Sequence, residues 1–427
     1  MMAQAYLAPD PALPQRDLLL DSPSVTAHLS RLLGNGKPSA IDRCERLRVN
    51  YQIGKSLRVL YRIGISGATL MVAARGFRNG CGAEEYRLAA PVAVSCGPAR
   101  PWLHDPELDT VFWTFPNDRQ LVHLRAVSTP APELRSLVPR WSASRLIRYA
   151  PEKSATLACL DDAGGILAYA KVGASPQVER DFQRYEALGR ALPSSDPHLR
   201  LPRAIAYSDH HRTLVLEPVP GRRLADADEA QPARDFARLG AAVATLHEIA
   251  PPQATPAFTH FDEDRLHKAA RLLGQVRPDV ARQAGELAEL LTSAKQAGAG
   301  DPVCLHGDIH SKNAILADDR VTLIDVEDLA VGPAAADIGS FLAGLQYLRR
   351  GNRIAISEND TLAEAFLAGY AAVRPLPGRA SLGWHTAAAL FIERAFHAVT
   401  RVRPNGLQHL GELLRDAGQL VTEACDV

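Results

Sequence analysis

The stretch that most constrains this chain is residues 303–341, which read VCLHGDIHSKNAILADDRVTLIDVEDLAVGPAAADIGSF. Two apolar runs, 314–316 and 321–324, flank Asp318-Asp319, and this pattern predicts a β-hairpin. Polar residues stand at the mouths of both strands: Asp308, His310 and Asn313 before the hairpin, and Asp325, Glu327 and Asp328 after it. Carboxylates crowded at two strand ends are costly unless a cation lies among them. A divalent metal that carries nucleotide phosphates would suit this stretch.

Upstream of the hairpin, residues 45–75 alternate in the manner of an antiparallel meander, and residues 145–172 show the same pattern a second time. The third strand ends in a cation both times, Arg75 in the first and Lys171 in the second. The matching residues with the same spacing are Tyr51, Lys55 and Ser56 in the first segment and Tyr149, Lys153 and Ser154 in the second. We interpret this as an internal duplication, the alternative being that three-stranded meanders with tight turns resemble one another.

The remaining pattern predicts an α+β protein. Outside the meanders we expect a helix at 25–34, strands near 91–96, 110–115, 203–208 and 213–217, and a helix at 176–192. The later half is mostly helical, with helices expected at 232–248, 262–273, 278–297, 337–350, 359–373, 380–401 and 406–424. A β-rich part therefore precedes a helical part that contains the hairpin.

The overall composition argues against several classes of function. Lys and Arg (48) balance Asp and Glu (48), so charge gives no reason to expect nucleic acid or a membrane as partner. We expect a cytoplasmic protein, because the sequence shows no signal peptide and no apolar run of the ~18 residues that a membrane span needs. The six cysteines form no CxxC pair, and His306, His310 and Asp308 lack a further His or Cys at zinc spacing.

Phosphoryl transfer needs a strand lysine for the phosphates, an acid on the next helix to hold it, and oxygen ligands for Mg²⁺. Lys171 ends a strand, and the following helix offers Asp181, Glu179 and Glu186 as candidate partners. Asp308 and Asn313 lie five residues apart on one loop, and Asp325 follows the hairpin. The chain therefore presents these parts in a usable order.

The segments HGDIHSKN, LIDVED and GPAAADIGSF resemble the aminoglycoside phosphotransferase and choline kinase-like family, which has a bilobal protein-kinase-like fold. LVLEPVPGRRL resembles its hinge, and ATLHEI its Leu-His segment. The resemblance covers about 145–400 and implies a β-rich N-lobe and a mostly helical C-lobe. With it, we expect a flexible lead at 1–25, an N-terminal α+β cap domain at 26–140, the N-lobe and hinge at 141–220, and the C-lobe at 221–427.

The resemblance also implies roles for individual residues. Asp308 would be the catalytic base, and Asn313 and Asp325 would bind Mg²⁺. The remaining implied roles are Lys171 on the α- and β-phosphates, Asp337 bracing the catalytic loop, His306 packing behind that loop, and Glu217 to Val219 presenting backbone to adenine.

Three departures from the family pattern stand out. Asp181 occupies the position where the lysine's partner is usually Glu, so Glu179 or Glu186 could take that role. The turn over the phosphates, residues 151–154, has no glycine, and Lys153 or Ser154 could compensate. Glu327 and Asp328 follow the metal Asp and could be metal ligands, substrate contacts or solvated charges.

These observations predict an ATP- and Mg²⁺-dependent kinase that phosphorylates a hydroxyl of a small molecule. We expect the acceptor to be a sugar, an amino sugar or an aminoglycoside, bound near Glu327, Asp328, Glu393 and Arg394. An extra domain before a kinase-like unit also resembles maltokinase-type enzymes, which favours a sugar. The alternative is a nucleotide-binding pseudokinase or scaffold whose N-terminal domain binds a partner.

Overall fold

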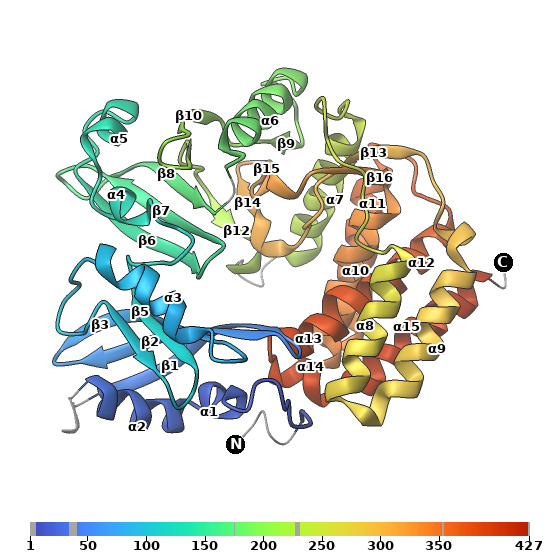
Figure 1. Cartoon of the computed structure of the whole chain (residues 1–427). Coiled ribbons are helices and arrows are strands. Elements are labelled where there is room, and N and C mark those ends of the chain that lie inside the picture. Colours follow the sequence, from blue (N-terminus) through green and yellow to red (C-terminus); the bar gives the residue numbers. More distant parts are fainter. Residues whose placement is uncertain (1–5, 34–40, 175, 227–230, 352–353, 426–427) are drawn as a thin grey trace. The chain divides into compact units, whose positions relative to one another are not determined.

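The structure is a computed structural model that describes residues 6–33, 41–174, 176–226, 231–351 and 354–425 (Figure 1). The chain divides into two compact units. The first contains residues 1–180, 205–217 and 400–404, and the second contains residues 181–204, 218–399 and 405–427. The helical second half and the β-rich first half together confirm the α+β prediction.

Two five-stranded sheets form the first unit, and each contains one of the predicted meanders. The first sheet has the order β1-β2-β3-β5-β4, with β1 (Ile41–Gln52), β2 (Ser56–Ile65), β3 (Ala68–Gly76), β4 (Trp102–Asp105) and β5 (Thr110–Thr114). The second has the order β10-β11-β8-β7-β6, with β6 (Ala143–Ala150), β7 (Ser154–Leu160), β8 (Ile166–Gly173), β10 (Ala204–Ser208) and β11 (Thr213–Leu216). The strands within each meander are antiparallel, as the alternating sequence predicts.

One hydrophobic core joins the two sheets of the first unit. Trp102 and Trp113 of the first sheet belong to the same buried cluster as Tyr149 and Leu157 of the second. The indole N–H of Trp113 also donates to the hydroxyl of Tyr149 at 2.8 Å. Short helices accompany the sheets: α3 (Gly82–Ala89), α4 (Leu124–Ser128) and α5 (Pro132–Leu137). The N-terminal sheet is therefore packed against the second meander as part of one folded unit.

Two expectations for the N-terminal part are wrong. Residues 6–25 are not a loose lead, because they contain α1 (Arg16–Leu20) and the start of α2 (Ser22–Leu33), and because Leu13 and Leu19 are buried and Arg16 is only 1% exposed. No strand covers 91–96, where the described residues form a short 3₁₀ turn, η1 (Ala90–Val92), and a single bridge from Cys96 to Ala99. Pro91 suits the short turn, since the first turn of a helix does not need the N–H that proline lacks.

The second unit is mostly helical. Its helices are α7 (Pro232–Glu248), α8 (Glu263–Val276), α9 (Ala281–Ser293), α10 (Ala335–Arg350), α11 (Ile356–Ala371), α12 (Arg379–Ala389), α14 (Pro404–Gln408) and α15 (Leu410–Cys425). The helix expected at 380–401 is interrupted, because residues 390–396 are π-helical between α12 and α13 (His397–Thr400). Helix α6 (Val178–Ala191) follows β8, as predicted. None of the helices in the described ranges has the length and apolar character that crossing a bilayer requires.

Candidate active site

The predicted hairpin is present in the second unit. Strand β14 (Ala314–Ala317) pairs antiparallel with β15 (Arg320–Leu323), and Asp318 turns the chain at φ +51°. The hairpin belongs to a four-stranded sheet with β12 (Arg222–Arg223) and β9 (Leu199–Arg200) at its edges. The N–H of Ile324 donates to the carbonyl of Asn313 at 2.9 Å, so the polar segments before and after the hairpin meet at its mouth.

Asp337, near the start of α10, holds the loop that precedes the hairpin. Its carboxylate accepts hydrogen bonds from the backbone N–H groups of His306 at 2.7 Å and Gly307 at 3.0 Å. Its Oδ2 also lies 3.1 Å from Nε2 of His247, whose Nδ1 lies 2.9 Å from the hydroxyl of Tyr370. Burial raises the pKa of Asp337, but the hydrogen bonds from His247 and the loop outweigh burial and bring that pKa below its usual value. An ionised Asp337 therefore fixes the loop.

His306 is fully buried behind the same loop in a defined tautomer. Its Nε2 lies 3.0 Å from the carbonyl of Ile324, which can only accept, so Nε2 carries the proton. Its Nδ1 then accepts the backbone N–H of Asp308 at 3.3 Å. The neutral imidazole thus links the loop before the hairpin to the strand end after it.

Glycine is required at position 307 of this loop. Gly307 has φ +81°, and a Cβ there would lie 2.1 Å from the carbonyl oxygen of Asp328. A side chain would push apart the two segments that carry Asp308 and Asp325, because the obstructing atom belongs to the backbone.

Asp308 and Asn313 lie on one closed loop, as their spacing predicted. The side-chain amide of Asn313 donates to the backbone carbonyl of Asp308 at 3.0 Å, and its backbone N–H donates to His310 at 2.9 Å. Asn313 is only 3% exposed, whereas the side chain of Asp308 is 54% exposed. The buried amide is therefore fixed with its oxygen unused by this contact, and the Asp308 carboxylate is open to solvent.

Asp325 follows β15 in the left-handed region, with φ 64° and ψ 45°. The next acid, Glu327, accepts a hydrogen bond from the hydroxyl of Tyr185 at 3.2 Å, and its carbonyl accepts one from Arg184 at 3.3 Å. Burial raises the pKa of Tyr185 well above its usual value, and the charges of Glu327 and Asp325 raise it further. Tyr185 and Arg184 were not singled out by the sequence, whereas Asp328 is exposed and consistent with a solvated charge.

The predicted acceptor residues Glu393 and Arg394 contact Ser340 of α10. The hydroxyl of Ser340 donates to Glu393 at 2.5 Å, and Nη2 of Arg394 donates to the carbonyl of Ser340 at 2.7 Å. Burial raises the pKa of Glu393. Nε2 of His310 lies 3.7 Å from Oδ2 of Asp308, and burial lowers the pKa of this histidine. The role of Glu393 and Arg394 in acceptor binding stays a prediction.

The predicted nucleotide residues are placed as follows. Lys171 lies in β8 of the first unit, opposite Thr156 of β7 and Leu214 of β11. Glu217 comes directly after β11, and Val219 follows in the hinge segment. Asp181, a candidate partner for Lys171, has an ion pair with Arg184 at 3.5 Å, while Glu179 accepts from Tyr207 at 3.4 Å and Glu186 is exposed. Which acid holds Lys171 stays a prediction.

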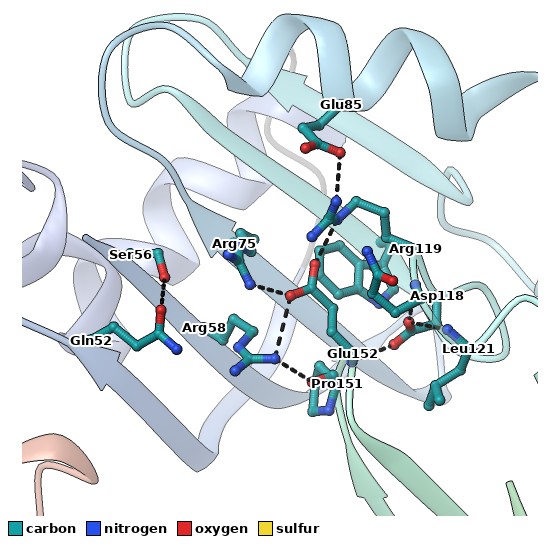
Figure 2. A network of polar contacts seen from close by, with 12 residues as sticks. Gln52, Ser56, Arg58, Arg75, Glu85, Asp118, Arg119, Leu121, Pro151 and Glu152 are labelled. Carbon is teal, nitrogen blue, oxygen red and sulfur yellow. Dashed lines mark hydrogen bonds and ion pairs between the residues drawn. The ribbon is translucent and has the colours of Figure 1, made fainter. Parts of the chain in front are cut away.

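The turn between β6 and β7 contains a residue that sequence reasoning missed. Glu152 occupies the left-handed region at φ +59°, and its side chain is only 2% exposed. Figure 2 shows its carboxylate among arginines of the first unit: Arg119 at 2.7 Å, Arg58 at 3.4 Å and, in closest contact, Arg75. No local pattern could reveal this cluster, because the partners lie 33 to 94 residues away in the chain.

A family model described as the phosphotransferase enzyme family matches residues 161–385, a little more than half of the chain. The matched region contains Lys171, the hinge, the braced loop and the hairpin. The chain belongs to the phosphotransferase enzyme family. This phosphotransferase is accordingly a small-molecule kinase, and the resemblance seen in the sequence is confirmed. The match does not extend to the N-terminal sheet, so the likeness of that part to maltokinase-type enzymes stays a prediction.

Solved structures similar to this phosphotransferase include several antibiotic kinases. APH(2'')-IIa in complex with streptomycin and ATP is 16% identical, with 68% of this chain and 96% of that chain covered and a TM-score of 0.46. Amicoumacin kinase hAmiN, in complex with AMP-PNP, Ca²⁺ and Ami, is 13% identical, with coverage of 67% and 92% and a TM-score of 0.49. An aminoglycoside phosphotransferase from Alicyclobacillus acidocaldarius is 18% identical, with coverage of 69% and 96% and a TM-score of 0.45. A search of curated protein sequences gives no match.

Proposed function

We propose that this phosphotransferase uses Mg²⁺ and ATP to phosphorylate a hydroxyl group of a sugar, an amino sugar or an aminoglycoside. The observation that carries the proposal is the braced loop. Asp337 holds its backbone, Asn313 closes it, and Asp308 alone among these three exposes a carboxylate. This is the arrangement that a general base needs, because the base must be fixed in position and still reach the acceptor.

The residues at the hairpin mouth fit a magnesium ion. Asn313 uses its amide N–H within the loop, which leaves the amide oxygen as a ligand, and Asp325 supplies carboxylate oxygens. Oxygen ligands of this kind suit Mg²⁺, which usually keeps several waters and binds nucleotide phosphates. When bound, the ion would neutralise charge on the transferred phosphate.

The chain's own residues have separate tasks in the transfer. Asp308 would take the proton from the acceptor hydroxyl as its oxygen forms a bond to the γ-phosphorus. The bond between that phosphorus and the β–γ bridging oxygen breaks, and ADP leaves. Lys171 would stabilise the nucleotide phosphates, as the family resemblance implies. The brace from Asp337 keeps Asp308 in place without contacting a reactant.

ADP release across a panel of sugars, amino sugars and aminoglycosides tests this function. We expect at least one acceptor to stimulate ADP release, and Asp308→Asn to reduce the stimulated rate by about a hundredfold or more, since it removes the base and keeps the shape. Asp319→Asn is the matched control, because Asp319 is an exposed acid in the turn of the same hairpin. Stimulated release that survives Asp308→Asn would contradict the mechanism.

The same assay addresses the alternative of a nucleotide-binding scaffold. The observation that favours the scaffold is Glu152, because its side chain occupies the β6–β7 turn, where the family often has glycine, and is directed to arginines. ATP binding without stimulation by any acceptor would support the scaffold over the kinase.

A further inference from the structure

A small pocket in the first unit lies between the first meander and the β6–β7 turn. It is open to solvent on one side, and it is lined by Arg48, Asn50, Arg58, Val59, Leu60, Ala150, Pro151 and Lys153. Arg48 and Asn50 share a face of β1, and Arg58 lies directly opposite Asn50 on β2. The two meanders therefore build this cationic pocket together.

The charge of the pocket lining is entirely positive. Arg48, Arg58 and Lys153 supply cations, Asn50 adds an amide, and the lining contains no carboxylate. Arg58 is held from behind, since its Nη1 donates to the carbonyl of Pro151 at 3.2 Å and lies 3.4 Å from Glu152. Its Nε is buried and has no hydrogen-bond partner among the described residues. The guanidinium of Arg58 is thus fixed in place with donor capacity unused.

Arg48 is a charge of the pocket that lies among other cations. It is half-buried, and the charges of the described residues that act on it most strongly all belong to arginines. Burial lowers the pKa of Arg48, and the neighbouring charges of Arg148, Arg58 and Arg403 lower it further. A half-buried cation surrounded by other cations is costly, and a bound anion would relieve that cost.

We propose that the cationic pocket binds a phosphate group, either as inorganic phosphate or as a phosphate monoester. Planar guanidinium groups match phosphate oxygens in pairs, and several positive charges favour a dianion over a single carboxylate. Pro151 and Lys153 belong to the turn that the family resemblance places over the nucleotide phosphates. A phosphate group bound in the pocket would therefore also contact that turn.

Calorimetric titration of the full chain tests the site, with inorganic phosphate and phenyl phosphate as probes at constant ionic strength. We expect saturable binding that Arg48→Gln weakens by about tenfold, the effect of losing one charged hydrogen-bond donor. Arg43→Gln is the matched control, because Arg43 lies on the same strand, is well exposed and does not line the pocket. Tighter binding of phenyl phosphate would assign the site to monoesters, and equal or weaker binding would assign it to free phosphate.

The variant Lys171→Met distinguishes phosphate binding in the pocket from phosphate binding at the nucleotide site. We expect this variant to retain phosphate binding, whether or not it retains kinase activity. Binding that is lost in Lys171→Met and kept in Arg48→Gln would overturn the proposal, as would the absence of saturable binding in the wild type. If circular dichroism shows that Arg48→Gln does not fold, Lys153→Gln replaces it. We expect Lys153→Gln to weaken phosphate binding several-fold, and unchanged binding would contradict the proposal.

Discussion

The two meanders of the first unit share one turn geometry and differ in what their charged residues contact. In each, one carboxylate oxygen accepts hydrogen bonds from a tyrosine hydroxyl and from the backbone N–H of the turn residue three positions later. Asp10 accepts Tyr51 at 2.6 Å and Gly54 at 3.0 Å, and Asp118 accepts Tyr149 at 2.6 Å and Glu152 at 2.9 Å. Gly54 and Glu152 both lie in the left-handed region, at φ +67° and φ +59°. These matches support the hypothesis of an internal duplication.

The two meanders differ in the cation at the end of the third strand, which is Arg75 in the first and Lys171 in the second. Arg75 pairs with Arg58 across β2 and β3, and Lys171 pairs with Thr156 across β7 and β8, which is the same position relative to each turn. Arg75 contacts the carboxylate of Glu152. We therefore expect the first meander to stabilise the second, while Lys171 serves the nucleotide.

The largest predicted effect is on the phosphotransfer rate, and it should differ between Lys171→Met and Arg75→Met. We expect Lys171→Met to reduce the phosphotransfer rate by about a hundredfold or more, since it removes a group that stabilises phosphate charge. Arg75→Met should change that rate by less than about tenfold, because Arg58 and Arg119 still contact Glu152. Steady-state kinetics on both variants would contradict the distinction if Arg75→Met were the more damaging.

Removing Glu152 should mainly affect stability. Glu152→Ala leaves Arg58, Arg75 and Arg119 without their shared partner, and we expect a loss of about 3 kcal/mol in the free energy of unfolding. Urea unfolding measures this loss in the free energy of unfolding. Glu84→Ala is the matched control, because Glu84 is an exposed acid paired with Arg87. An equal effect of the two substitutions would contradict the inferred role of Glu152.

The hairpin and its preceding loop could be predicted from sequence, whereas these contacts could not. Asp308, Asn313 and Asp325 lie within 18 residues of one another, so a local pattern was enough to predict the loop and hairpin that carry them, and their roles stay predictions. Asp10 and Glu152 act through partners far along the chain, and their effect depends on burial that no local pattern encodes. The same reason explains the error over residues 6–25, whose prolines suggested a loose segment while Leu13 and Leu19 are buried.

Asp10→Asn and Asp118→Asn form a matched pair. Each replaces an acceptor oxygen with an amide donor opposite a tyrosine hydroxyl and a turn N–H, so we expect each to cost about 1–3 kcal/mol of unfolding free energy. Only Asp118→Asn should also raise the KM for ATP, because its turn belongs to the second meander. An equal change in KM for both variants would remove the functional distinction between the turns.

The smallest effect concerns pH. Burial raises the pKa of Asp118, although hydrogen bonds from Tyr149 and the backbone of Glu152 oppose that shift. A carboxyl group whose pKa is raised by folding favours the folded state below its ordinary pKa near 3.8, and this contribution is lost as pH rises through the raised value. The stability of the wild type relative to Asp118→Asn should therefore fall between that pH and neutrality. A relative stability that rises over this interval would contradict the assignment.

The most direct test of the account counts nucleotide sites by calorimetric titration with Mg²⁺ and a non-hydrolysable ATP analogue. We predict one site per chain, which Lys171→Met weakens severely and Arg75→Met leaves at near wild-type affinity once folding is confirmed. Two sites per chain, or one site that depends on Arg75 and not on Lys171, would contradict the division between a nucleotide-binding meander and a supporting one.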